Sequence, residues 1–136
     1  MTKRILLVDD EARIRSIIRL SLEHLCGWEV IEAECGAIGL QQAHQVQPDA
    51  ILLDMSMPDL DGMAFLERLQ DDPQTALIPT VFLTAKVPTA DAITWAGRQR
   101  PANLRGTLTK PFDPLLLGQQ VAALLGWAIA PTEPLG

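Results

Sequence analysis

The chain has 136 residues, the usual length of one domain, and 48% of its residues are hydrophobic, which is enough for one core. Seventeen acidic and eleven basic residues give a net charge of −6 at pH 7, and this charge repels nucleic-acid phosphates and anionic membrane surfaces. The nearest basic group, Arg98, Arg100 and Arg105, is too dispersed for a nucleic-acid-binding stripe. We therefore expect a single domain without direct nucleic-acid binding.

The cysteine spacing and the hydropathy of the sequence indicate the cellular compartment in which the protein is expected. Cys26 and Cys35 do not form a CxxC pair, and no cleavable apolar signal segment is visible, so a reducing cytoplasm is the simplest expectation. The most apolar C-terminal run, residues 115–130, is interrupted by Gln119 and Gln120 and is shorter than the roughly 20 residues of a spanning helix. We expect no insertion into a membrane.

Strand patterns alternate with helical patterns along the chain. An apolar run over residues 5–8 predicts a buried strand, and the apolar residues that follow it at helical spacing predict a helix. These residues are Ile14, Ile17, Ile18, Leu22 and Leu25. The further strands are predicted at residues 28–33, 49–54, 78–84 and 105–109. The further helices are predicted at residues 37–46, 62–69, 90–98 and 114–125.

This alternation predicts an α/β fold with a doubly wound, five-stranded parallel sheet. The strands are apolar on both faces, as expected when helices cover both sides of a parallel sheet. We assign residues 1–125 to this domain and residues 126–136, with two prolines and little periodicity, to a C-terminal extension or linker stub with no second domain after it. Ligands of such folds bind outside the carboxyl ends of the strands.

Four of the five predicted strands end on chemically active side chains. Asp9 and Asp10 follow the first strand, Asp54 ends the third, Thr84 ends the fourth, and Lys110 follows the fifth. Each residue alone has an ordinary explanation, since an aspartate after a strand often caps a helix or makes a turn, and Asp10 could cap the first helix. Their joint position at one edge of the sheet favours a functional site.

Three carboxylates at one edge need neutralisation. At an effective dielectric constant near 20, two unit charges about 4 Å apart repel by about 4 kcal/mol, so three pairs approach the stability of a whole domain. Lys110 and a divalent cation can both relieve this repulsion, and oxygen ligands favour Mg²⁺. Such a pocket suits phosphoryl chemistry, and Asp54, aimed by a central buried strand, is the best candidate nucleophile.

Four motifs resemble the receiver domain of two-component response regulators. They are "ILLVDDE", "ILLDMSMPDLDG", "VFLTAK" and "TLTKPFDP", in the expected order and nearly the expected spacing, over about residues 3–125. The resemblance implies a flavodoxin-like, CheY-like sheet with the strand order 2-1-3-4-5. It also implies a phosphoacceptor signalling switch rather than an enzyme, with only the self-catalysed phosphorylation and dephosphorylation of its family.

The resemblance further implies how the acidic residues act. Asp54 accepts the phosphoryl group from a sensor histidine kinase or a phosphotransfer protein. Mg²⁺ is bound by Asp10, Asp54 and the backbone carbonyl of Ser56, and Asp9 acts through water.

Other residues concern the phosphoryl group and the switch. The resemblance implies that Thr84 and Lys110 contact the phosphoryl oxygens, and that the peptide bond from Lys110 to Pro111 is cis. Ala85, small and directly after Thr84, leaves the group accessible. Thr107 stands where the family usually has Tyr or Phe, so the usual switch, in which the aromatic moves inward with the threonine, is altered here.

Several positions leave two interpretations open. Ser56 and Lys86 occupy positions that tune the lifetime of the phosphorylated state in the family, but Lys86 is equally an ordinary surface lysine. Arg15 and Arg19 are either a docking surface for a kinase or phosphotransfer domain, or a solvated helix face. Residues 95–106 look a few residues longer than usual before the fifth strand, which predicts a remodelled output face.

Three functions compete. The first is a stand-alone phosphoacceptor, a monomer or weak dimer, whose phosphorylated state a downstream protein recognises. The second is a Mg²⁺-dependent phosphatase or phosphotransferase using the same aspartyl-phosphate, but Ser56 stands where such enzymes place a general acid, and no cap domain is present. The third is a degenerate receiver that binds partners without phosphorylation, although none of the expected acids, threonine or lysine is lost.

Overall fold

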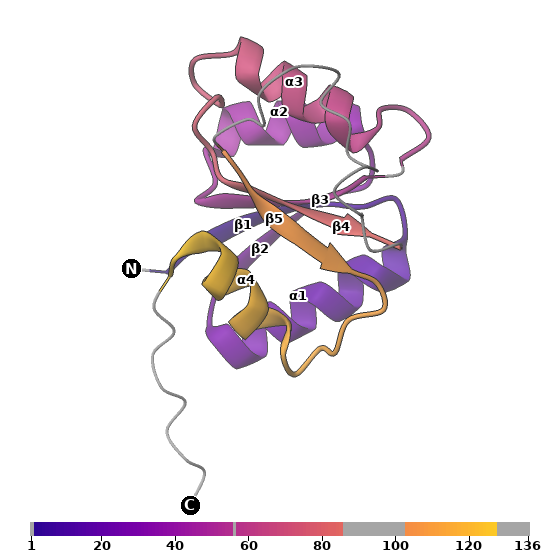
Figure 1. The fold of residues 1–136 in the computed structure, drawn as a ribbon, viewed down its shortest axis with the longest axis vertical. Helices are drawn as coiled ribbons and strands as arrows, with labels where there is room; N and C mark the ends of the chain where they lie inside the picture. The colour runs from indigo at the N-terminus through magenta and orange to yellow at the C-terminus, as the bar shows by residue number, and fades with distance from the viewer. Residues whose placement is uncertain (1, 56, 86–102, 128–136) are drawn as a thin grey trace, which may run out of the picture.

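The computed structural model describes residues 2–55, 57–85 and 103–127. Within them one parallel sheet has the order β2-β1-β3-β4-β5, so the predicted fold class and strand order are confirmed. The strands are β1 (Arg4–Val8), β2 (Glu29–Ala33), β3 (Ala50–Asp54), β4 (Thr80–Thr84) and β5 (Leu104–Thr109). The helices are α1 (Ala12–Cys26), α2 (Gly36–Val46), α3 (Gly62–Asp71) and α4 (Leu117–Leu125). Figure 1 shows α2 and α3 over one face of the sheet, and α1 and α4 over the other.

The strands carry apolar residues at consecutive positions because each face of the sheet packs against its own hydrophobic core. In β1, Ile5 and Leu7 belong to the core under α1 and α4, whereas Leu6 and Val8 belong to the core under α2 and α3. All four side chains are fully buried. Successive residues of a strand point to opposite faces, so a sheet covered on both sides needs apolar residues at every position.

Two predicted elements begin two or three residues later than the sequence pattern suggested. The fourth strand was expected from residue 78 but begins at Thr80, because Pro79 has no N–H to pair and Ile78 donates its N–H to the Thr75 carbonyl in a turn. The last helix was expected from residue 114 but begins at Leu117. The Asp113 side chain accepts the N–H of Leu115 at 2.9 Å, which holds the preceding residues in a turn.

Aromatic residues hold the two ends of the described chain together, far from the carboxyl ends of the strands. Trp127, just after α4, packs edge-on against Trp28 with ring centroids 5.2 Å apart and an interplanar angle of 87°. The ammonium of Lys3 lies 4.8 Å from the Trp127 ring centroid, a cation–π geometry. Trp127 therefore packs on the domain, although the sequence pattern placed it in the C-terminal extension.

Some of the sequence predictions fall on residues outside the ranges that the structure describes. The helix expected at residues 90–98 and the longer segment at residues 95–106 lie wholly or mostly there. Among the described helices, none has both the length and the apolar character needed to cross a membrane.

Candidate functional site

The strand ends bring the predicted residues to one edge of the sheet. Asp9 follows β1, Asp54 is the last residue of β3, Thr84 is the last residue of β4, and Lys110 follows β5. β3 lies between β1 and β4, so Asp54 occupies the middle of this edge. The backbone N–H of Lys110 donates to the Thr84 carbonyl at 2.7 Å, which joins the last two strand ends.

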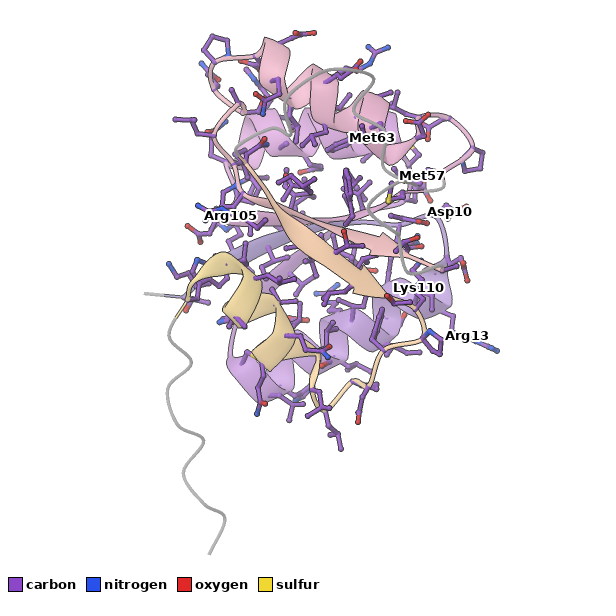
Figure 2. The ribbon with its side chains drawn as sticks, viewed as in Figure 1. Asp10, Arg13, Met57, Met63, Arg105 and Lys110 are labelled. Atoms are coloured by element: carbon purple, nitrogen blue, oxygen red, sulfur yellow. The ribbon has the colours of Figure 1, made fainter. Side chains whose placement is uncertain are left out.

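The acidic cluster comprises Asp9, Asp10 and Asp54. One carboxylate oxygen from each lies within 4.8 Å of the other two. Asp9 is 0% exposed and Asp54 is 5% exposed, whereas Asp10 is exposed to solvent. Figure 2 shows Asp10 and Lys110 at the end of the sheet toward which the β5 arrow points, with Arg105 at the opposite end. The cluster is therefore rigidly backed by the core and open to solvent at Asp10.

Lys110 supplies the positive charge of the cluster. Its Nζ lies 2.8 Å from Asp9 Oδ2 and 3.7 Å from Asp54 Oδ2, and its side chain is 14% exposed. Burial by itself lowers the pKa of Lys110, but the hydrogen bond to Asp9 and the attraction of the nearby carboxylates outweigh it and raise the pKa above the usual lysine value. Lys110 thus remains an ammonium ion beside the carboxylates. The bond from Lys110 to Pro111 is cis, as expected.

Asp9 is held in place by its neighbours. Its backbone N–H donates to the Ala33 carbonyl of β2 at 3.1 Å, and its Oδ1 accepts the N–H of Glu11 at 2.9 Å. Together with the Lys110 contact, these bonds leave the Asp9 carboxylate little freedom to turn. Asp10 does not cap the first helix: α1 has Glu11 at its N-cap position and no side-chain cap there.

The loop between β3 and α3 is anchored on α2. Asp59 accepts the N–H of Gly36 at 3.0 Å and that of Ala37 at 3.1 Å, so it caps α2, whose own N-cap residue makes no side-chain cap. These backbone bonds, that from Gly36 foremost, lower the pKa of Asp59. Gly62 donates its N–H to the Met55 carbonyl at 3.0 Å, and a Cβ on Gly62 would lie 3.0 Å from Met55 Cα. Proline and glycine after Asp54 therefore turn the chain tightly beside the site.

Arg15 and Arg19 of α1 share one carboxylate partner on β2. Arg15 Nε lies 3.2 Å from Glu32 Oε1, and Arg19 Nη1 lies 2.9 Å from Glu32 Oε2. Arg19 also pairs with Glu23 at 2.6 Å, and both partners raise its pKa, the Glu23 bond most. Arg15 Nη1 in addition donates to the backbone carbonyl of Asp9 at 2.6 Å.

The remaining predicted residues are only partly described. Thr84 is half-buried and Ala85 is exposed beside it. Thr107 is half-buried and lies next to Phe82 in the β4–β5 register. Ser56 and Lys86 lie outside the described residues.

The donor set suits a hard divalent cation. All three side chains offer oxygen, and in Mg²⁺ complexes ligands on opposite sides of the ion, each at about 2.1 Å, are about 4.2 Å apart. The separation of up to 4.8 Å between the carboxylate oxygens is close to this span. The spacing of the three carboxylates is therefore compatible with such an ion.

A family model decides the identity of this domain. The model for the response regulator receiver domain matches residues 5–122. The chain belongs to this family. Receiver domains are the signalling phosphoacceptors of two-component systems, and domains of this family interact with histidine kinases and downstream effectors.

Individual relatives agree with this assignment. Protein PilH of Pseudomonas aeruginosa is 36% identical over 122 residues, 90% of this chain and 97% of PilH. The chemotaxis response regulator CheY4 of Vibrio cholerae superposes with a TM-score of 0.78 at 27% identity, covering 91% of this chain and 99% of CheY4.

A third relative concerns the metal. The receiver domain of the sensor histidine kinase PA1611 from Pseudomonas aeruginosa has a magnesium ion coordinated in its active-site cleft. It superposes with a TM-score of 0.76 at 26% identity, covering 93% of this receiver domain and 99% of that chain. The chain spans about half the length of several transcriptional regulators that it also matches.

Two features of the receiver domain escaped the sequence analysis. Arg15 was singled out as a docking or solvated residue, but nothing in the pattern indicated that it reaches the Asp9 carbonyl. The strand predicted at residues 28–33 was the one to which no active side chain was assigned, whereas its Glu32 binds two arginines. The contacts join α1 to the ends of the strands before and after it, at separations of 6, 13 and 17 residues, and the spacing along the chain does not reveal which side chains meet.

Proposed function

We propose that Asp54 is the phosphoacceptor of this receiver domain, and that its donor is a phosphohistidine of a sensor kinase or a phosphotransfer protein. The observation that carries the proposal is the position of Asp54. It ends the central strand β3, is 5% exposed, shares the acidic cluster with Asp9 and Asp10, and has the Lys110 ammonium 3.7 Å away. A nucleophile held this rigidly loses little conformational freedom when it reacts.

In the proposed reaction an oxygen of the Asp54 carboxylate attacks phosphorus as the phosphorus–nitrogen bond of the phosphohistidine breaks. The electron pair leaves with the imidazole nitrogen, which takes up a proton, and Asp54 becomes an acyl phosphate. Lys110, 3.7 Å from Asp54, would stabilise the negative charge on the transferred oxygens, and the Thr84 hydroxyl would donate a hydrogen bond to them.

The proposed cofactor is Mg²⁺, held by Asp10, Asp54 and the backbone carbonyl of Ser56, with Asp9 acting through water. When bound, it neutralises charge on the phosphoryl oxygens. The chain's own part is to hold the ligands: Asp9 is fixed by Glu11 and Lys110 and cannot readily turn toward the ion.

The output of the switch is also a proposal. Thr107 replaces the usual aromatic, so the change on phosphorylation passes to a downstream protein without an aromatic rotamer switch at this position. Ala85 leaves the site accessible, and Ser56 and Lys86 tune the lifetime of the phosphorylated state. We assign residues 1–125 to the receiver domain, place it in the cytoplasm, and expect a monomer or weak dimer.

Intact-mass spectrometry tests the proposal. The protein is incubated with Mg²⁺ and a small acyl-phosphate donor, beside the variants Asp54→Asn and Asp71→Asn. Asp71 is an exposed carboxylate at the end of α3 and serves as the matched control. The wild type and Asp71→Asn should gain one acid-labile phosphoryl group, and Asp54→Asn should gain none. A folded wild type that gains none, or an Asp54→Asn variant that gains one, would refute the assignment.

A further inference from the structure

The two neighbouring acids of the cluster differ in how they are held. Both Asp9 carboxylate oxygens accept a hydrogen bond, one from the Glu11 N–H and one from Lys110. Asp10 is exposed, and within the described residues its side chain makes no hydrogen bond or ion pair. The position of the Asp10 carboxylate therefore depends on its backbone.

The backbone at Asp10 is fixed by the peptide group that precedes it. A trans peptide group is planar, and the plane that contains the carbonyl of Asp9 also contains the N and Cα of Asp10. A group that holds the Asp9 carbonyl oxygen therefore holds the point from which the Asp10 side chain starts. β1 ends at Val8, so this carbonyl lies beyond the strand ladder.

Arg15 holds this carbonyl oxygen. Its Nη1 donates to it at 2.6 Å, a hydrogen bond strengthened by the charge of the guanidinium. The same guanidinium uses Nε to bind Glu32 of β2 at 3.2 Å, and the side chains of Arg15 and Glu32 are only 14% and 27% exposed. Because the planar guanidinium is bound at two points, its direction is set by β2 as well as by α1.

We propose that Arg15 is a positioning residue of the cation site: oriented by Glu32, it fixes the peptide plane between Asp9 and Asp10 and so presents the Asp10 carboxylate to a bound divalent cation. The proposal rests on the proposed function, since it takes Asp10 as a Mg²⁺ ligand. Arg15 itself does not touch the ion. It acts through the backbone, as partners outside the ligand set do in other metal sites.

The substitution Arg15→Lys tests this role because it keeps the charge and removes the two-point contact. A loss of charge would itself change the attraction for a cation, and the lysine variant avoids this effect. Arg13→Lys is the matched control: Arg13 is exposed on the same helix and points away from the cluster in Figure 2. If Arg15→Lys does not fold, Glu32→Gln replaces it, with the exposed neighbour Glu34→Gln as its control.

The measurement is Mg²⁺ binding to the folded protein by isothermal titration calorimetry, with thermal unfolding in EDTA recorded separately. We expect Arg15→Lys to raise the Mg²⁺ dissociation constant about tenfold, and Arg13→Lys to leave it within about twofold. A purely structural Arg15 would lower the unfolding temperature in EDTA without changing Mg²⁺ affinity, and that result would overturn the inference. A wild type that binds no Mg²⁺ would overturn the proposed cofactor as well, so the two failures are distinguishable.

Discussion

The substitution Asp54→Asn should stabilise the protein when no divalent cation is present. It removes one negative charge and keeps the shape of the side chain. At an effective dielectric constant of about 20, carboxylate oxygens at the upper limit of 4.8 Å repel by about 3.5 kcal/mol, and Lys110 at 3.7 Å attracts Asp54 by about 4.5 kcal/mol. Asp54 faces two such carboxylates, so repulsion exceeds attraction by about 2.5 kcal/mol. The variant should gain roughly this free energy of unfolding.

Thermal and urea unfolding at pH 7.5 measure this difference, first in EDTA and then with excess Mg²⁺. For a domain of this size, about 2.5 kcal/mol corresponds to a rise of about 9 °C in the melting temperature. Mg²⁺ should stabilise the wild type more than the variant, because binding to the folded state adds stability only where the ligands are intact. The control Asp71→Asn should stay within about 0.5 kcal/mol of the wild type. An Asp54→Asn variant less stable than the wild type in EDTA would refute the electrostatic reasoning.

Three more predictions concern stability, each measured by urea unfolding. Asp59→Ala should cost about 1 kcal/mol at pH 7 through loss of the α2 cap. The folded pKa of Asp59 is depressed, so the stabilisation by its carboxylate is complete above the ordinary pKa of 3.8 and is lost as the pH falls through the folded pKa. The unfolding free energies of the wild type and Asp59→Ala should therefore converge below pH 3.8. A difference that stays constant with pH would contradict this. Gly39→Ala should lower the free energy of unfolding by about 1 to 3 kcal/mol, because the new Cβ would lie 2.9 Å from the Phe65 ring. An unchanged urea midpoint would show instead that the core rearranges to accept the methyl group. Trp127→Ala should cost about 2 kcal/mol through lost packing on Trp28, and Trp127→Phe clearly less. Equal losses in both Trp127 variants would count against ring packing.

The sheet and its edge were predictable because their signals are local. Successive side chains of an apolar run such as Ile51, Leu52 and Leu53 point to opposite faces of the sheet, so both faces must be covered. This implies a parallel sheet between helices. Parallel strands end together, so the residues that follow them must meet. The position of Asp54 beside Lys110 was therefore deducible without knowing any side-chain angle.

The supporting contacts were not predictable in the same way. Arg15 lies six residues from Asp9 and seventeen from Glu32, and only the crossing of α1 over β2 brings all three together. Asp59 caps a helix whose first residue, Gly36, lies 23 residues before it in the chain. Helix capping is usually sought in the residues next to the helix, so this signal was missed.

The packing of Trp127 against Trp28 and Lys3 has a practical consequence for experiments on this domain. The two ends of the described chain meet at the amino-terminal side of the sheet, and Asp54, at the far end of the five-residue strand β3, lies about 13 Å from the start of that strand. An affinity tag or a fluorophore attached next to Lys3 or directly after Trp127 would start on the side away from the acidic cluster. Donor proteins could then approach Asp54 unhindered while the label reports on binding.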